Sequence, residues 1–233
     1  MSNSYFKFKQ FTIYQDRCAM KVGTDGVLLG AWTDVSSAHS VLDIGTGTGL
    51  ISIMLAQRCM AEITAIEIDE EAAQQATENV AASKWKDRIT VVNRALQDFS
   101  IDASFDRIVS NPPYFNQALK SPEQKRTTAR HTESLSYHDL LAGVNHYLQD
   151  DGIFSIILPF SEKDRFYQLA EAEQLYPCRE TIIYSTPNSQ PKRFMAEFQR
   201  KKTDFEPHSL IIEANGRHQY SEEYKKLTED FYL

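Results

Sequence analysis

The sequence predicts an α/β protein built on a doubly wound, mostly parallel sheet, and two observations lead to this fold class. Short apolar runs typical of buried strands alternate along the chain with segments typical of helices. Two of these strands end in segments that break regular structure, a glycine-rich turn at 45–49 and a proline pair at 112–113. Ligands of open α/β sheets bind at the carboxyl ends of the strands. We therefore expect the functional site at this edge of the sheet.

Length, composition and charge fit one domain with a full core. The chain has 233 residues, of which 42% are hydrophobic and 24% charged. It shows neither an apolar run of membrane-spanning length nor the apolar centre of a signal peptide, so we expect a cytoplasmic protein that does not contact membranes. The net charge of −7 argues against non-specific nucleic-acid binding by the whole surface but allows a local basic patch. A monomer is the default expectation.

Cysteine and histidine usage predicts neither a disulfide framework nor a metal site. The three cysteines lie far apart and form no CxxC motif, which suits reduced thiols. The six histidines show no metal-ligand spacing and stand near no nucleophile motif. We expect no metal.

The N-terminal residues 1–35 form an extension before the main sheet. Aromatic and polar residues alternate from Tyr5 to Tyr14, which predicts a strand or hairpin. A polar turn then leads into a short apolar helix, which Thr24 or Asp25 would cap. The N-terminal amides of that helix would face any anionic ligand.

The strand at 41–44 runs into the turn Gly45-Thr46-Gly47-Thr48-Gly49, which opens an apolar helix. Glycines at this spacing let a backbone approach a ligand closely. The dinucleotide fingerprint requires Gly-x-Gly-x-x-Gly, and Leu50 stands where its last glycine would be. Asp43 precedes the turn by two residues. A cationic or zwitterionic ligand such as S-adenosylmethionine fits this arrangement better than a pyrophosphate, and a purely structural turn is the alternative.

The next strand, at 63–69, carries a carboxylate near its end. Glu67 stands where an open α/β sheet needs an acceptor for ribose hydroxyls. Asp69 is expected to cap the helix that follows.

A third strand, at 89–92, is followed by an acid and an aromatic residue. Asp98 would accept a hydrogen bond from an adenine amine, and Phe99 would pack on the adenine ring. A solvated loop carboxylate is the alternative interpretation of Asp98.

The strand at 105–110 ends in Asn111-Pro112-Pro113-Tyr114. Two prolines continue neither a sheet nor a helix, so they make a stiff corner. The Asn111 amide oxygen and the Pro112 carbonyl are acceptors, and the Tyr114 ring is flat. Together they suit a planar base that carries an NH2 group, and an ordinary turn is the alternative.

Residues 115–133 form a long segment without periodicity, which in a compact domain is typical of a lid or binding loop. In an acidic protein, a basic segment beside a base-shaped corner predicts phosphate contacts. A solvated loop is the alternative. A turn-rich loop at 187–193 also has a basic end. The candidate RNA contacts of these two segments are Lys120, Lys125, Arg126, Arg130, Lys192 and Arg193.

The rest of the chain supplies further helices and strands. Ser136 would cap a helix ending near 151–152, a strand follows at 153–159, and another helix begins after Ser161. Strands are expected at 181–185 and 194–200, and Ser221 would cap a last helix.

The glycine turn with Asp43, the acid Glu67 and the Asn111 corner together resemble class I S-adenosylmethionine-dependent methyltransferases that methylate planar nitrogens. The chain is similar in particular to the bacterial valine-tRNA adenine-N6 methyltransferases, which act on the adenine just 3′ of the anticodon. This similarity rests on Gln15, on the run Met20–Trp32, on the corner 111–115 with Arg130, and on the ending Tyr220–Leu233. It implies a Rossmann-like, seven-stranded sheet with an antiparallel last strand, in a single domain spanning 1–233.

The resemblance also implies residue roles. Residues 1–35 would cover the cofactor, with Lys21, Thr24 and Asp25 at its methionine end. The turn glycines and Thr46 would pass beneath it, Glu67 would hold its ribose, and Asp98 and Phe99 would hold its adenine. Asn111, which also borders the cofactor, and Pro112 would accept the two hydrogens of the target amine, with Pro113 stiffening the corner and Tyr114 stacking on the base.

Other substrates share this corner. A ribosomal RNA adenine-N6 or guanine-N2 methyltransferase is the main alternative, because the corner does not distinguish an amine on adenine from one on guanine. Release-factor glutamine methyltransferases usually carry an N-terminal helical domain, and DNA adenine methyltransferases a target-recognition insertion. Neither is visible, so we expect tRNA and not DNA as the partner. A non-catalytic RNA-binding protein that kept the fold is a further alternative.

Overall fold

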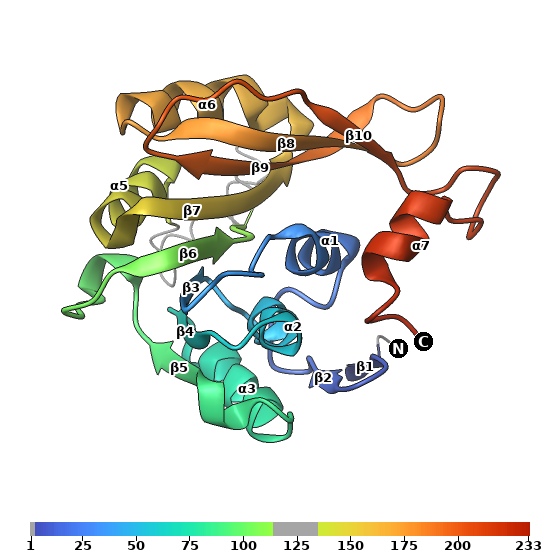
Figure 1. Cartoon of the computed structure of the whole chain (residues 1–233). Coiled ribbons are helices and arrows are strands. Elements are labelled where there is room, and N and C mark those ends of the chain that lie inside the picture. Colours follow the sequence, from blue (N-terminus) through green and yellow to red (C-terminus); the bar gives the residue numbers. More distant parts are fainter. Residues whose placement is uncertain (1–2, 114–134) are drawn as a thin grey trace, which may run out of the picture.

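The computed structural model describes residues 3–113 and 135–233. Its centre is an eight-stranded sheet with the strand order β10-β8-β9-β7-β6-β3-β4-β5 (Figure 1). The strands are β3 (Ser40–Ile44), β4 (Glu62–Glu67), β5 (Ile89–Asn93), β6 (Phe105–Ser110), β7 (Leu148–Pro159), β8 (Tyr176–Tyr184), β9 (Pro191–Gln199) and β10 (His208–Ile211). Strands β3 to β7 pair in parallel, and β9 is antiparallel to both β7 and β8. The predicted fold class is confirmed.

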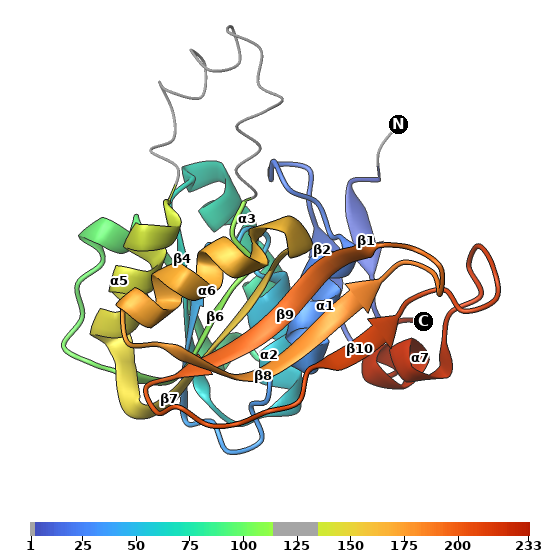
Figure 2. The ribbon, with the colours of Figure 1, turned by 90° about the horizontal axis from the view of Figure 1, so that it is seen from above.

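The sheet has one strand more than the seven expected. Strand β10 adds to the outer edge of β8 in parallel, with His208 opposite Thr181 and Ile211 opposite Tyr184. Figure 2 shows β8, β9 and β10 running together along this edge of the molecule. The four residues of β10 follow a proline and include a histidine and a serine. Such a segment has little strand signal of its own, and the free edge of β8 supplies its hydrogen-bonding partner.

Helices cover both faces of the sheet, as a doubly wound fold requires. Helices α1 (Thr24–Trp32), α2 (Leu50–Arg58) and α3 (Glu70–Ala81) pack on one face with the short α7 (Glu222–Thr228). Helices α5 (Tyr137–Tyr147) and α6 (Lys163–Ala172) pack on the other (Figure 1). Each face has its own cluster of buried apolar side chains. Burying one large aliphatic side chain stabilises the fold by roughly 1.5–3 kcal/mol.

The two ends of the chain meet on the α1 face. Strands β1 (Tyr5–Lys7) and β2 (Thr12–Tyr14) form the expected hairpin. The Phe8 ring stacks on Tyr232 with ring centroids 5.9 Å apart, and the Lys9 amide donates to the carbonyl of Phe231 at 2.8 Å. The hairpin is therefore held by residues from the opposite end of the sequence (Figure 1).

Three predicted helix caps are confirmed. The side chains of Asp69, Ser136 and Ser221 accept hydrogen bonds from the backbone amides of Ala72, Asp139 and Tyr224. Each bond satisfies one of the amides that a helix leaves without a partner in its first turn.

Three local expectations are wrong. Gly23 occupies the N-cap of α1, since the helix starts at Thr24, and no side chain among the described residues caps it; the Asp25 carboxylate pairs with Arg193. Helix α5 ends at Tyr147, since the chain passes directly into β7 at Leu148. Residues 191–193 begin β9 and do not end a loop.

Candidate active site

A cavity of about 670 Å³ opens at the carboxyl ends of the central parallel strands. Three segments that lie far apart in the sequence line most of it: 18–26, the glycine turn 44–48 and the corner 110–113. The cavity lies at the point where the strand order reverses between β3 and β6, which is where doubly wound sheets bind ligands. Its volume is within the range of about 300–1,000 Å³ typical of cofactor pockets.

The glycine turn reaches the cavity through backbone conformations that suit glycine. Gly45 and Gly47 have φ angles of 74° and 57°, in the left-handed region. The amides of Gly45 and Thr46 both donate to the carbonyl of Ile66, at 2.9 and 3.0 Å. These bonds hold the turn against the end of β4.

Asp43 lies beneath the turn, outside the residues that line the cavity. Its side chain is fully buried, and its Oδ2 accepts hydrogen bonds from the hydroxyls of Thr46 and Ser52, both at 2.6 Å. Its Oδ1 is buried without a partner among the described residues. Burial raises the pKa of this carboxyl to about 6, against the opposing effect of the two hydroxyls. Asp43 therefore organises the turn from below.

Glu67 supports the glycine turn from the side of the cavity. Its carboxylate accepts from the amide of Gly47 at 2.8 Å and from the amide of Asp69 at 3.0 Å. Glu67 lines the cavity at the end of β4, and its position is the one expected for an acceptor of ribose hydroxyls.

Buried amide side chains join the N-terminal extension to the glycine turn. Asn79 on α3 exchanges two hydrogen bonds with the backbone of Tyr14, both at 2.9 Å, and donates to the carbonyl of Thr48 at 2.8 Å. Gln15 accepts from the amide of Val22 at 2.8 Å. The extension that borders the cavity is thus fixed in place by α3 and by its own internal contact.

Helix α1 brings its first turn to the centre of the site. A Cβ on Gly26 would stand 3.2 Å from Leu50 and 3.8 Å from the Asn111 Nδ2, so the helix passes close to both the glycine turn and the corner. One residue earlier, the Asp25 carboxylate pairs with the Arg193 guanidinium at 2.8 Å. This ion pair joins the start of α1 to the start of β9.

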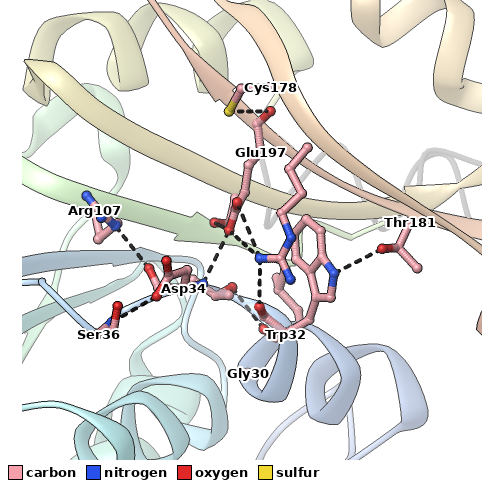
Figure 3. A network of polar contacts seen from close by, with 12 residues as sticks. Gly30, Trp32, Asp34, Ser36, Arg107, Cys178, Thr181 and Glu197 are labelled. Carbon is pink, nitrogen blue, oxygen red and sulfur yellow. Dashed lines mark hydrogen bonds and ion pairs between the residues drawn. The ribbon is translucent and has the colours of Figure 1, made fainter. Parts of the chain in front are cut away.

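The other end of α1 is fastened to the same pair of strands. The Trp32 indole donates to the Thr181 hydroxyl at 3.0 Å, and the Arg179 guanidinium lies 4.0 Å from the centre of the Trp32 ring (Figure 3). Arg179 also pairs with the buried Glu197 at 3.4 Å. Helix α1 is therefore held against β8 and β9 at both ends.

The corner after β6 presents Asn111 to the cavity. The Ser110 hydroxyl donates to the carbonyl of Ile44 at 2.9 Å, which holds the end of β6 beside the start of the glycine turn. The Asn111 Oδ1 is buried and has no hydrogen-bond partner within the described residues. Pro112 and Pro113 also line the cavity, and Tyr114 lies outside the described residues. A buried acceptor without a partner is unusual, and a ligand that brought a donor to it would satisfy it.

The structure brings most of the predicted cofactor residues together. Those that line the cavity are Lys21, Thr24, Asp25, Gly45, Thr46, Gly47, Glu67 and Asn111. Gly49 lies behind the turn, where a Cβ would stand 3.5 Å from Ala76. Of the predicted RNA contacts, Arg193 lines this cavity and Lys192 a smaller one beside it. Lys120, Lys125, Arg126 and Arg130 lie outside the described residues.

Asp98 and Phe99 do not line the cavity. Asp98 is exposed, and the Phe99 ring packs in the core 5.3 Å from Tyr147. Leu96 and Gln97, which the sequence interpretation missed, line the cavity instead. They come sooner after β5 ends, and this closeness to the edge of the sheet is the signal that would have identified them.

The cavity also contains a thiol. Cys18 is buried in its wall, and burial raises the pKa of the Cys18 thiol to about 11, so it stays protonated at neutral pH. Within 3–113 and 135–233, no three histidine, cysteine or acidic side chains gather where they would hold a metal ion. None of the helices in those ranges is long and apolar enough to cross a membrane.

Comparisons with known proteins agree with this geometry. The chain matches the methyltransferase small domain family model over residues 21–159. Over its whole length it is 50% identical to the tRNA1(Val) (adenine(37)-N6)-methyltransferase of Bacteroides fragilis and 51% identical to that of Phocaeicola vulgatus, and it covers 99% of each.

Solved structures show the same fold. A predicted O-methyltransferase from Agrobacterium tumefaciens matches with a TM-score of 0.70 at 19% identity, over 89% of this chain and 96% of that one. A glycopeptide N-methyltransferase complexed with S-adenosylmethionine matches with a TM-score of 0.58 at 15% identity, over 78% of this chain and 100% of that one.

Fold, glycine turn and comparisons together define a class I S-adenosylmethionine-dependent methyltransferase. More particularly, the chain belongs to the methyltransferase small domain family, together with the relatives named tRNA1(Val) (adenine(37)-N6)-methyltransferases. The residues present fit the cofactor. The cavity has a suitable volume, the glycine turn leaves open space where a Cβ on Gly45 or Gly47 would lie, and Glu67 stands at the end of β4.

Proposed function

We propose that the protein transfers a methyl group from S-adenosylmethionine to the N6 amine of an adenine in tRNA, namely the adenine just 3′ of the anticodon in a valine tRNA. The observation that carries this proposal is the buried, unpartnered Asn111 Oδ1 at the wall of the cofactor cavity. An acceptor that finds no donor in the described part of the chain suits a substrate with an NH group. The activities named for the full-length relatives supply the identity of the RNA.

The chemistry follows from the electronic structure of adenine. Its amino lone pair is delocalised into the ring, so the nitrogen is a poor nucleophile. Bound S-adenosylmethionine supplies an electrophilic methyl group. The Asn111 Oδ1 and the Pro112 carbonyl accept hydrogen bonds from the two amine N–H groups, which favours a pyramidal nitrogen with its lone pair free. Positioning of this kind replaces a strong base. Methyl transfer would leave S-adenosylhomocysteine, and the methylated nitrogen would then lose one proton to solvent.

The rest of the site orients these two acceptors. The Ser110 hydroxyl fixes the end of β6 to β3, and the two prolines restrict the backbone that follows. Gly26 places the start of α1 beside the Asn111 amide. We further propose that Glu67 holds the cofactor ribose, with Leu96 and Gln97 beside the adenine, and that Lys21, Thr24 and Asp25 lie at the methionine end.

The target base must leave its loop to reach the cavity, as bases do in enzymes that modify them. Tyr114 is proposed to stack on it, which would contribute on the order of 1–3 kcal/mol. Lys192 and Arg193 are proposed to contact the RNA backbone, together with the basic residues at 120–130. We also propose a monomeric, single-domain protein that works in the cytoplasm, and light scattering of the purified protein would test its oligomeric state.

The experiment that tests the function combines the protein, labelled S-adenosylmethionine and total tRNA from cells that lack this protein. Digestion and nucleoside mass spectrometry then identify the product. We expect N6-methyladenosine in a valine tRNA. Label in ribosomal RNA or in guanosine would contradict the substrate while leaving the cofactor chemistry intact. Cofactor binding without transfer to any RNA would contradict the proposed activity.

A further inference from the structure

A second cavity, of about 270 Å³, lies beside the large one. It is bounded by the first half of α1, the end of β8, the start of β9 and Ile212 just after β10. Thr24, Asp25 and Arg193 line both cavities. The two spaces are therefore neighbours that share one wall, on the side of the site where β8 and β9 stand.

The lining of the second cavity combines three kinds of group. Leu28, Ile183 and Ile212 supply its apolar lining, of which Ile212 is half-buried and the other two are almost completely buried. The hydroxyl of Ser185 adds a neutral polar group. The charged lining residues are Lys192, Arg193 and Asp25, two cations and one anion, so this lining is net positive in a chain of net charge −7. These groups suit a nucleotide: the apolar lining faces a base, the hydroxyl bonds to its edge, and the cations contact a phosphate.

The walls of this cavity are held by hydrogen bonds within the protein. The amide of Ile212 donates to the carbonyl of Tyr184 and the amide of Glu213 to that of Ser185, both at 2.9 Å. The following turn is closed by the Ser189 hydroxyl, which donates to the carbonyl of Thr186 at 2.9 Å. With α1 fastened at both ends, the space is preformed, and preformed sites bind with a lower entropic cost.

We propose that the second cavity is a subsite for one nucleotide next to the target adenine in the RNA. This proposal rests on the proposed function and adds to it the part of the substrate that this cavity holds. The volume, just below the lower end of about 300 Å³ for small-molecule pockets, suits a single nucleotide. Arg193 borders both cavities, so the phosphate that joins the two nucleotides would pass beside its guanidinium.

A pair of matched variants tests the subsite. Ser185→Tyr fills the cavity, whereas Ser209→Tyr adds the same side chain to an exposed serine of the neighbouring strand β10, outside the lining. We expect Ser185→Tyr to raise the KM for tRNA about tenfold, the size of effect expected from losing one bound base. The Kd for S-adenosylmethionine should stay unchanged in both variants, and thermal melts confirm that both fold. Equal KM values for the two variants would overturn the proposal.

The identity of the occupant is tested with anticodon stem-loop RNAs that lack one base, either 5′ or 3′ of the target adenine. With wild-type protein, one of these abasic substrates should raise KM about tenfold. With Ser185→Tyr the same abasic substrate should cause no further increase in KM, because both changes remove the same interaction. If the KM increases caused by Ser185→Tyr and by the abasic substrate multiply, the subsite proposal is wrong and the proposed function still stands. A wild-type protein that methylates no RNA would overturn the proposed function, and this proposal with it.

Discussion

Two buried oxygens near the glycine turn have no hydrogen-bond partner within residues 3–113 and 135–233. The Asp43 Oδ1 lies beneath the turn, inside the protein, and the Asn111 Oδ1 belongs to a residue that lines the cofactor cavity. The first is a cost to the folded state, visible as the raised pKa of Asp43. The second belongs to a residue that a ligand in the cavity would touch. The same local feature therefore has opposite meanings, and its position relative to the cavity decides which applies.

The largest expected effect comes from removing the acceptor at the cavity. Asn111→Ala should lower kcat by about 10²–10³-fold, the usual loss when one preorganised hydrogen-bonding group leaves an active site. Cofactor affinity should change by about twofold at most, because other segments form most of the cofactor cavity. Steady-state kinetics and calorimetric titration with S-adenosylmethionine measure the two quantities. Asn188→Ala, in an exposed turn, is the control. Comparable losses of turnover and affinity would contradict the role.

Removing the charge beneath the turn should change stability and its pH dependence. The pKa of Asp43 is about 6 in the folded protein and near the ordinary value of 3.8 when unfolded, so the folded state holds the proton more tightly. The free energy of unfolding therefore falls as pH rises from about 4 to 6, by on the order of 3 kcal/mol.

Urea unfolding at several pH values checks this expectation. The unfolding free energy of wild type minus that of Asp43→Asn should fall as pH rises and then level off above the folded pKa of Asp43. Asp102→Asn, at an exposed carboxylate, should show no such trend. Parallel curves for wild type and Asp43→Asn would mean that folding does not shift the pKa of Asp43.

Glu67 sharpens the comparison, because its carboxylate both supports the turn and lines the cavity. Glu67→Ala removes a charged hydrogen-bonding group, which is worth about 1.5–3 kcal/mol, and should weaken S-adenosylmethionine binding roughly ten- to 150-fold. Glu62→Ala, at the exposed start of the same strand, is the matched control. Calorimetry on both variants gives the answer, and equal Kd values would exclude a cofactor role for Glu67.

The smallest effect is expected at the basic start of β9. Lys192→Ala should reduce the slope of log KM for tRNA against log salt concentration by about 0.7, the contribution of one phosphate contact to a single strand. Lys201→Ala, an exposed lysine just beyond the other end of β9, should leave the slope as it is. If both variants keep the wild-type slope, Lys192 does not contact the RNA.

The sequence by itself determined the features that depend on a few neighbouring residues. The glycine turn, the proline corner and the caps at Asp69, Ser136 and Ser221 all follow from local backbone preferences, which act within one turn of chain. The alternation of strands and helices predicted the doubly wound sheet for the same reason.

The tertiary structure alone decided which side chains meet. Asp25 and Arg193, 168 residues apart, form an ion pair that no local pattern predicts. Strand β10 exists because β8 offers it an edge. Phe99 packs in the core, while Leu96 and Gln97 border the cavity, because of how the chain turns after β5. Such contacts depend on the packing of distant segments, since a residue's type does not specify which way its side chain will face.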